Sequence, residues 1–365
     1  MPDATISHKT GALVAMGREH AGAFIDNLET SISDVATAAG RLPCTRNGGG
    51  SRTCYICCPT VAYLDYALSE LRHFEGHRIL ALALRALVSA SRPVLRASGV
   101  DRHVQPNNWL LATNPVPDLD LAEIAGITER LRREHPRHAI VWRSLNAYSD
   151  AGKIERFRQA GYDLFPARQI YLFDCTSRQP ARHRDERRDL ELTERSEYRA
   201  IGPDEIEPAD YERMAQLYGL LYLDKYTRLN PQYSAAFMAA AHRAGLIDFH
   251  ALRRRDGRLD GFIGFFDAGE TMTAPMVGYD TSLPQELGLY RRLMAVGLQR
   301  ARARRMLFNM SAGAAGFKRN RGGIAAIEYA AVYTRHLPVG QRAACWIVRS
   351  VLEKVGQTLL TRFEL

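Results

Sequence analysis

The sequence predicts an α/β protein built of two lobes, each with a mixed central sheet flanked by helices. Residues 121–174 and 281–333 show the same order of an amphipathic helix, a buried strand, a short helix and another strand. The chain has 365 residues, more than one hydrophobic core usually supports. The run at 177–188 has few apolar and many charged residues, which indicates a linker between the lobes.

These observations divide the chain into five parts. We expect an N-terminal extension with a Cys-rich strand, a degenerate first lobe, a charged linker, a second lobe that holds the donor site, and a C-terminal helix. Their bounds are 1–60, 61–176, 177–188, 189–338 and 339–365.

The N-terminal extension is the least patterned part of the chain. Residues 1–40 suggest one or two helices, and the glycine-rich run 47–51 suggests a loop before a strand with Cys54, Cys57 and Cys58.

The cysteines leave two interpretations open. Cys54 and Cys57 have the spacing of a zinc-binding pair. Cys44, or His73 and His77 one helical turn apart, could supply the further ligands of a zinc site. Neighbouring Cys57 and Cys58 would point to opposite faces of a strand, so we favour buried thiols in a reducing compartment and no metal.

The first lobe should begin with two helices within 63–97. The repeat then predicts a helix at 121–133, a strand at 139–144, a short helix at 153–160 and a strand at 170–173.

In the second lobe the pattern predicts two helices and then three strands. The helices span 209–226 and 231–244, and the strands 249–252, 261–266 and 272–279 form an antiparallel meander. Residues 339–363 predict a final helix.

The long helix of the second lobe begins near residue 283. Ser282 and Gln285 form a capping-box pattern, with Pro284 in the first turn. A helix that starts after a strand presents backbone N–H groups and a positive dipole end to an anion. Gln285 could therefore contact such an anion, or it could serve only as the partner of Ser282.

The run from Gln285 through Gly288 to Tyr290 resembles the acyl-CoA-binding signature of GNAT acyltransferases, although a small residue usually stands where Tyr290 does. Phe317 and Lys318 also look like the aromatic–lysine pair of the related Fem-type and cellulose-biosynthesis-type enzymes. The resemblance implies an acyl-CoA, or an acyl group on a carrier protein, as the donor. The donor-binding residues would be Gln285, Gly288, Tyr290, Arg291 and Tyr279.

Acyl transfer to an amine needs a neutral amine, a donor for the oxyanion and a proton for the thiolate. The resemblance places the oxyanion donor on a backbone N–H within 274–279. The usual helix tyrosine is absent, so the acid is Tyr279, Tyr290, Tyr329 or water, and we expect Tyr329. Asn309 would contact the acyl group or the acceptor.

A general base is less clearly marked in the sequence. Glu328 and Asp280 are the candidates, and either could also be an ordinary carboxylate at a strand end.

The acceptor should be a small amine or an amino acid. Tyr222, Asp224, Lys225 and Tyr226 join the first two helices of the second lobe, and this mixture would suit a zwitterion or only end a helix.

The net charge of +9 supports a rival function. Basic residues in the linker could contact the phosphates of aminoacyl-tRNA, as the Fem-type resemblance implies. A non-catalytic binding module is a third possibility. No apolar run reaches the roughly 18 residues of a membrane span, and no secretory signal is visible, so we expect a cytoplasmic protein.

Overall fold

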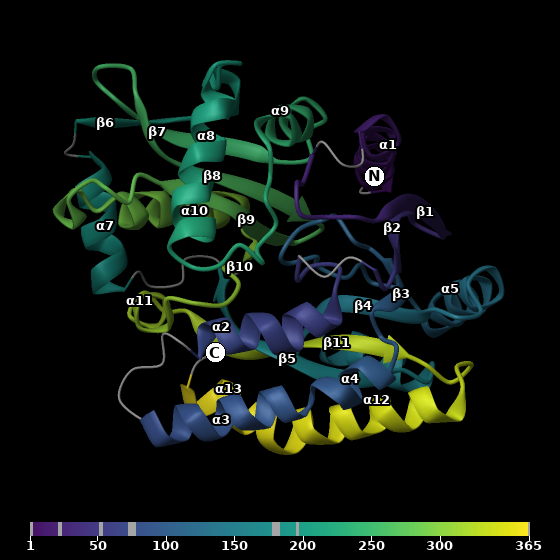
Figure 1. Ribbon diagram of the computed structural model, residues 1–365. Helices are drawn as coiled ribbons and strands as arrows, with labels where there is room; N and C mark the ends of the chain where they lie inside the picture. Colours follow the sequence, from purple (N-terminus) through teal and green to yellow (C-terminus); the bar gives the residue numbers. More distant parts are fainter. Residues whose placement is uncertain are drawn as a thin grey trace.

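One 11-stranded mixed sheet runs through the whole molecule, in the order β1-β2-β3-β4-β11-β5-β10-β9-β8-β7-β6. Figure 1 shows the computed structural model, which describes residues 3–20, 24–50, 54–71, 78–176, 183–194 and 197–363. The α/β class is confirmed, but the expected pair of separate lobes is not found. The two halves share a single continuous sheet.

The first half contributes four consecutive strands at one end of this sheet. They are β1 (Ser31–Thr37), β2 (Gly40–Gly48), β3 (Arg102–Pro106) and β4 (Ala139–Asn146). β1, β2 and β3 pair antiparallel, whereas β3 and β4 pair parallel.

The second half contributes the other end of the sheet. Its strands are β6 (Tyr198–Ile201), β7 (Asp248–Arg254), β8 (Leu259–Ala268), β9 (Thr271–Tyr279) and β10 (Leu307–Asn309). β7, β8 and β9 form the expected antiparallel meander, and β9 pairs parallel with β10.

In the middle of the sheet the two halves exchange strands. β11 (Ile324–Tyr333) belongs to the second half by sequence but pairs with β4, and β5 (Asp163–Asp174) of the first half pairs with β10. β5 and β11 pair antiparallel with each other. Each half therefore completes the sheet of the other.

The repeat predicted from the sequence is present as β3-α5-β4-α6-β5 and β9-α10-β10-α11-β11. Its helices are α5 (Leu121–Glu134), α6 (Ala151–Gln159), α10 (Leu289–Arg304) and α11 (Ala315–Arg319). Both copies begin with a parallel strand pair and end with the exchanged strand.

Helices cover both faces of the sheet. In the second half, α8 (Asp210–Tyr218) and α9 (Ala235–Arg243) pack on one face and α10 on the other. In the first half, α5 and α6 share one core, and α4 (Arg92–Ala97) and α12 (Val339–Val351) share another. The remaining helical segments are α1 (Asp3–His20), η1 (Val61–Tyr66), α2 (Ala67–Glu70), α3 (Arg78–Ala90), α7 (Arg184–Glu194), η2 (Pro203–Glu205), η3 (Gly219–Asp224), η4 (Gln285–Leu287), η5 (Leu352–Gly356) and α13 (Gln357–Phe363).

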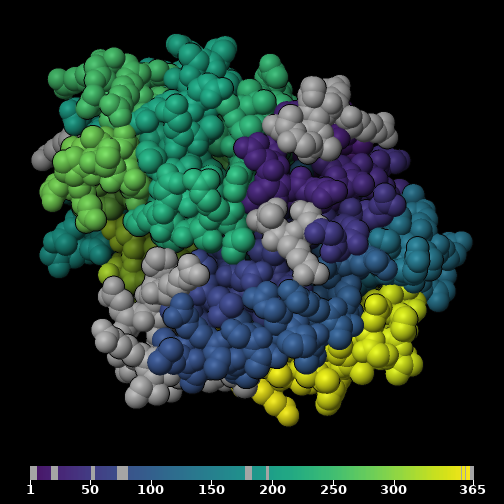
Figure 2. All heavy atoms as spheres, viewed as in Figure 1, coloured from purple at the N-terminus to yellow at the C-terminus, as the bar shows by residue number. Residues whose placement is uncertain are grey.

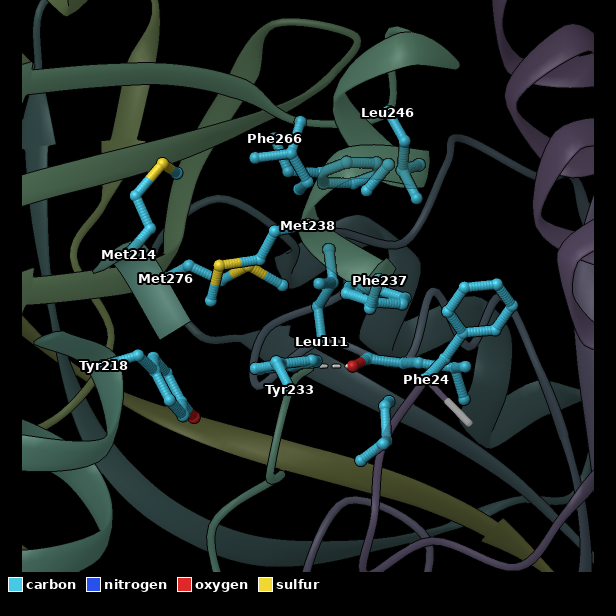
Figure 3. Close-up of a cluster of buried hydrophobic side chains, with 14 of the residues drawn as sticks. Phe24, Leu111, Met214, Tyr218, Tyr233, Phe237, Met238, Leu246, Phe266 and Met276 are labelled. Atoms are coloured by element: carbon cyan, nitrogen blue, oxygen red, sulfur yellow. Dashed lines mark hydrogen bonds between the residues drawn. The ribbon is translucent and has the colours of Figure 1, made fainter. Parts of the chain in front are cut away.

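The core of the second half includes residues from the first. Trp109, Leu110 and Leu111 follow β3 and are buried among side chains of α8, α9 and β8. The Tyr233 hydroxyl donates to the Leu110 carbonyl oxygen at 2.7 Å, and Figure 3 shows Leu111 beside Tyr233 and Phe237. Burial of this loop ties the two halves together outside the sheet as well.

The N-terminal expectations are partly wrong. Only α1 is helical within the described part of residues 1–40, because 31–37 and 40–48 pair as a hairpin. Cys54, Cys57 and Cys58 lie in a turn before η1 and not in a strand. All six cysteines are buried, and none of them is in a disulfide bond.

One further segment differs from expectation. The charged run at 177–188 is helical from Arg184, while 177–182 lie outside the described residues.

Within the described part of the chain, no group of three or more His, Cys, Asp or Glu side chains could hold a metal, and His73 and His77 lie outside it. None of the described helices is long and apolar enough to cross a bilayer.

Candidate active site

β9 and β10 separate from each other after a short stretch of pairing. Their pairing covers only three residue pairs and ends with Asn309 opposite Thr273, although β9 continues to Tyr279. On the other side of β9, Phe265 faces both Ala274 and Pro275 in a bulge. A bulge bends its strand and Pro cannot donate to a ladder, so Pro275 explains why β9 leaves β10 at this point.

The side chain of Tyr222 confirms that the sheet is open here. It packs against the core on the α8 face and also against the core on the α10 face. One side chain can reach both cores only where no strand separates them.

Seven half-buried or exposed tyrosines extend from this opening toward Arg143 and Glu328, and we call them the tyrosine cluster. Its members are Tyr55, Tyr63, Tyr66, Tyr222, Tyr226, Tyr279 and Tyr290. Ring centroids lie 5.0 Å apart for Tyr55 and Tyr66, 6.2 Å for Tyr222 and Tyr226, and 6.2 Å for Tyr279 and Tyr290. Burial raises the pKa of most of these phenols, so they stay protonated at neutral pH.

The cluster draws its members from both halves of the chain. Burial, and then the charges of Tyr290, Tyr226, Tyr55 and Arg168, determine the pKa of Tyr222, so first-half and second-half side chains are close neighbours. In Figure 2 the green atoms of the second half meet the blue atoms of the first along a seam on this face.

Two π-helical segments carry much of the tyrosine cluster. η1 holds Tyr63 and Tyr66, and η3 holds Tyr222 with Tyr226 two residues beyond its end. A π-helical turn is rare and occurs frequently at functional sites, because it turns side chains away from regular helical positions.

A buried charged pair lies beside the tyrosine cluster on the exchanged strands. Glu328 of β11 is 2% exposed and accepts from Arg168 Nε at 2.8 Å and from Nη2 at 3.3 Å. Burial opposes the charge of Arg168, but the Glu328 carboxylate raises the pKa of Arg168 above its ordinary value. The Arg168 guanidinium therefore binds both oxygens of Glu328 as a fork of two donors.

Lys318 is also buried at this place, at the end of α11. Its Nζ donates to the carbonyl oxygens of Met310, Ser311 and Ala312 at 2.8, 3.1 and 2.8 Å. Burial, and next the charge of Arg168, lower the pKa of Lys318 to about 7. Because all three donors are used, Lys318 fixes the loop that follows β10.

The amino end of α10 differs from the expected capping box. The helix begins at Leu289, and Gly288 caps it in the left-handed region with φ +61°. Ser282 donates to Asp280 instead, at 2.5 Å, and Gln285 is exposed in η4.

α7 covers one side of this helix end. A Cβ on Gly288 would lie 2.7 Å from Leu192 Cδ2, and Arg292 donates to the Leu192 carbonyl oxygen. Arg291 is bound by Asp189 of α7 at 2.7 Å. On another side, Tyr290 turns toward Phe317, with ring centroids 4.8 Å apart. Of the expected donor-binding residues, Tyr279 and Tyr290 therefore lie in the tyrosine cluster, whereas Arg291 is held by α7.

The expected catalytic residues do not lie together. Asn309 is opposite Leu172 on β5 and Tyr329 is opposite Pro166, which places them six residues apart, or about 20 Å along the sheet. Tyr329 packs partly against the core of α5 and α6. Asn309 is buried, and its Oδ1 accepts from the Ser311 N–H at 2.9 Å.

The partners of Asp280 do not favour a role as the general base. Its Oδ2 accepts from Arg213 and from Arg258, each at 2.6 Å. Although burial raises its pKa, the bonds from Ser282 and Arg213 lower the pKa of Asp280 to about 2.

The expected acceptor residues separate into two pairs. Tyr222 and Tyr226 belong to the tyrosine cluster, whereas Asp224 and Lys225 are exposed. Asp224 lies 3.5 Å from Arg228, one helical turn away.

Sequence reasoning missed the first-half part of the site. Tyr55, Tyr63, Tyr66, Arg143 and Arg168 lie far from the recognised motif and come together only through the strand exchange. The spacing of the tyrosines at 55, 63 and 66 carries no signal for this, because π-helical turns have no clear sequence pattern.

A small pocket elsewhere is apolar. Its lining includes Leu13, Ile25, Leu28, Leu110 and Phe237, beneath α1. It offers almost no polar group, so we place the candidate site at the opening between β9 and β10.

Comparisons with known proteins give structural likeness only. No family model matches the chain, and no curated protein matches it. The structure is similar to GNAT-fold proteins, among them FemX at 8% identity and a TM-score of 0.48, with 62% of this chain and 81% of that chain covered. L-PGS from Bacillus licheniformis is similar at 12% identity and a TM-score of 0.45, with coverage of 63% and 77%. A tandem GNAT protein from the clavulanic acid biosynthesis pathway is similar at 13% identity and a TM-score of 0.35, with coverage of 63% and 75%.

Proposed function

We propose that this protein is an N-acyltransferase that moves an acyl group from a thioester donor, acyl-CoA or an acyl-carrier protein, to the amine of a small molecule or amino acid. The observation that carries the proposal is the opening of the sheet between β9 and β10 at Thr273 and Asn309. Beyond this point β9 has no β10 partner, so a substrate carbonyl could approach its backbone N–H groups.

The tyrosine cluster supplies the proton chemistry that the reaction needs. A thiolate leaving group must be protonated, and a phenol that stays protonated at neutral pH is a suitable donor. Burial raises the pKa of Tyr290, which lies beside Tyr279 at the end of β9. We therefore assign the role of general acid, which protonates the thiolate, to Tyr290 or Tyr279 in place of Tyr329. Asn309 would make a polar contact with the acyl group or the acceptor.

Glu328 is better suited to position other groups than to accept the amine proton. Both of its oxygens accept hydrogen bonds from Arg168, so neither oxygen is directed toward an incoming amine. The amine would then reach the site already neutral or lose its proton to water.

Donor binding can be tested by following the melting temperature with a panel of acyl-CoAs. A donor at about 100 times its dissociation constant should add roughly 2.7 kcal/mol to the free energy of unfolding. Tyr290→Ala should reduce this gain, while Tyr333→Ala, which removes a half-buried tyrosine at the far end of β11, should not. Equal responses in both variants would contradict the proposed donor site.

Aminoacyl-tRNA is a second candidate donor. The exposed arginines of α7 favour it. The helix turns Arg184, Arg187 and Arg188 to the solvent and buries Glu186 and Asp189. A steep fall in tRNA affinity with salt would support this donor, because displaced counterions make binding strongly salt-dependent. If neither donor class binds, a non-catalytic binding module becomes the better interpretation.

A further inference from the structure

The first-half side of the site carries more positive charge than its carboxylates neutralise. Arg143 of β4 and Arg168 of β5 both donate to the carbonyl oxygen of Ala112, at 3.2 and 2.9 Å. Glu328 pairs with Arg168. Among the described residues no carboxylate pairs with Arg143, so this group of three side chains keeps one net positive charge.

Arg143 has donors to spare as well as charge. Its Nη1 donates to the Ile56 carbonyl oxygen at 2.8 Å and its Nη2 to Ala112. A guanidinium has five N–H donors, so about three have no acceptor among the described residues. The side chain is only partly buried, with its guanidinium carbon 5.9 Å from the centre of the Tyr55 ring.

The hydroxyl of Tyr63 is a second unsatisfied group at the same place. It is buried without a hydrogen-bond partner. After burial, the charges that act on it are those of Arg143 and then Glu328. A buried polar group without a partner is costly, and a guanidinium without a counter-ion is also unfavourable when partly desolvated. Holding two carbonyl oxygens would need only a neutral donor, so the contact with the Tyr55 ring is the one structural use of the charge of Arg143 among the described residues.

We propose that Arg143 binds an anionic group of the acceptor, a carboxylate or a phosphate, while the amine of the same molecule reacts at the opening between β9 and β10; this rests on the proposed transfer function. Four strand spacings separate β4 from β9, which is about 19 Å between backbones. The long side chain of Arg143 shortens this distance, but the acceptor would still be longer than a free α-amino acid.

The strand order favours the acceptor over the donor as the source of the anion. The expected donor residues lie on β9 and α10, whereas Arg143 is on the far side of β11 and β5 from them. A phosphate of the donor would be the alternative anion.

The test uses amine acceptors in matched pairs, each a linear amino acid or short peptide and its terminal carboxamide. For the wild type, kcat/KM should favour the carboxylate member about 100-fold among the longer pairs, as expected for a charge-assisted bond. Arg143→Gln should bring this ratio close to 1, and Arg143→Lys should keep part of it. Arg132→Gln, which removes an exposed arginine paired with Glu129, should leave the ratio unchanged.

Three results would overturn the proposal. An equal loss for both members of each pair in Arg143→Gln would mean that Arg143 only holds the loops, and circular dichroism would show whether that variant still folds. A wild type without preference would remove the subsite. A higher KM for acyl-CoA with an unchanged acceptor ratio would assign the anion to the donor.

Calorimetry separates this inference from the transfer function. The same pairs are titrated into the protein without a donor. Preferential binding of the carboxylate members that Arg143→Gln abolishes would support the subsite even if no acyl transfer is found. The absence of that preference would overturn the subsite, whatever the transfer assay shows.

Discussion

At the scale of single residues, Asp280 shows how a plausible base becomes a structural group. Its carboxylate accepts from Arg213, Arg258 and Ser282 and is 4% exposed. A carboxylate at the end of a strand is visible in the sequence, but its partners are not.

Asp280→Asn should therefore lower stability in a pH-dependent way. The folded pKa of about 2 lies below the unfolded value near 3.9, so the contribution of Asp280 is complete above pH 4 and is lost as the pH falls toward 2. We expect the variant to lose about 2 kcal/mol of unfolding free energy at pH 7 and progressively less below pH 4. Urea unfolding at several pH values measures this difference.

Asp224→Asn is the matched control, because Asp224 is exposed and pairs only loosely with Arg228. A surface pair of this kind contributes little. A loss in Asp280→Asn that stayed constant from pH 7 to pH 2 would contradict the role given to Asp280.

Gly288 has a structural reason to be glycine. It lies just before the helix and not inside it, and its positive φ and the contact with Leu192 require glycine whether or not a ligand lies nearby. Gly288→Ala should cost about 2 kcal/mol of stability, since it adds left-handed strain and displaces a side chain. Thermal unfolding provides the measurement.

Gly316→Ala in α11 is the control for this change. A Cβ there meets nothing within 4 Å, and the φ of Gly316 is not in the left-handed region. Alanine should therefore be neutral or stabilise α11 by up to about 1 kcal/mol. If both variants lost the same stability, the contact with Leu192 would not be the cause.

At the scale of elements, α7 binds neighbouring segments through two buried carboxylates, Glu186 and Asp189, which we call the α7 clamp. Asp189 is 1% exposed and accepts from Arg291 of α10 and from Arg321 just after α11. Glu186 binds Arg302 through two bonds of 2.7 Å. The carboxylates face inward and most of the arginines outward, so a composition that indicated a linker forms a packed helix.

Asp189→Asn should destabilise the protein by about 3–5 kcal/mol, because it leaves two arginines without their counter-ion at a buried site. Chemical denaturation would report the loss as a lower midpoint with an unchanged slope. Asp185→Asn on the same helix is the control, since Asp185 lies 3.7 Å from Arg188 near the surface. A similar effect in both variants would show that helix propensity is being measured and not the clamp.

Elements with a strong period were predictable from the sequence, and those that depend on distant partners were not. α5, α6, β7, β8 and β9 follow clear helical or alternating patterns and are confirmed. β1, β2 and β3 were missed, because their apolar residues are few and their stability comes from pairing. The site was half predictable for the same reason: its second-half side lies on the recognised segment, while Arg143 and Arg168 reach it through strand pairing.

At the scale of the whole molecule, the exchange of β5 and β11 makes the halves inseparable. Cutting the chain between Thr176 and His183 should give two fragments that do not fold alone but recover the fold when mixed. Each fragment lacks an interior strand of the sheet and would expose strand edges that are paired in the intact protein. Circular dichroism of the separate and mixed fragments tests this expectation.

The intact chain should unfold in one cooperative transition for the same reason. Tryptophan fluorescence reports on Trp109 and Trp142, which are both buried, and should change together with the helical signal. Two separated transitions would show that the halves are independent despite the shared sheet.

The position of β11 near the carboxyl end also affects how the protein is made. During synthesis the first half leaves the ribosome without the strand that must lie between β4 and β5. That strand begins at Ile324, 150 positions after β5 ends at Asp174. Until it arrives, β4 and β5 either stay apart or pair wrongly, so newly made chains would need protection from a chaperone. A truncation of the last 45 residues would remove β11 and would therefore mainly disrupt the sheet of the half that was translated first.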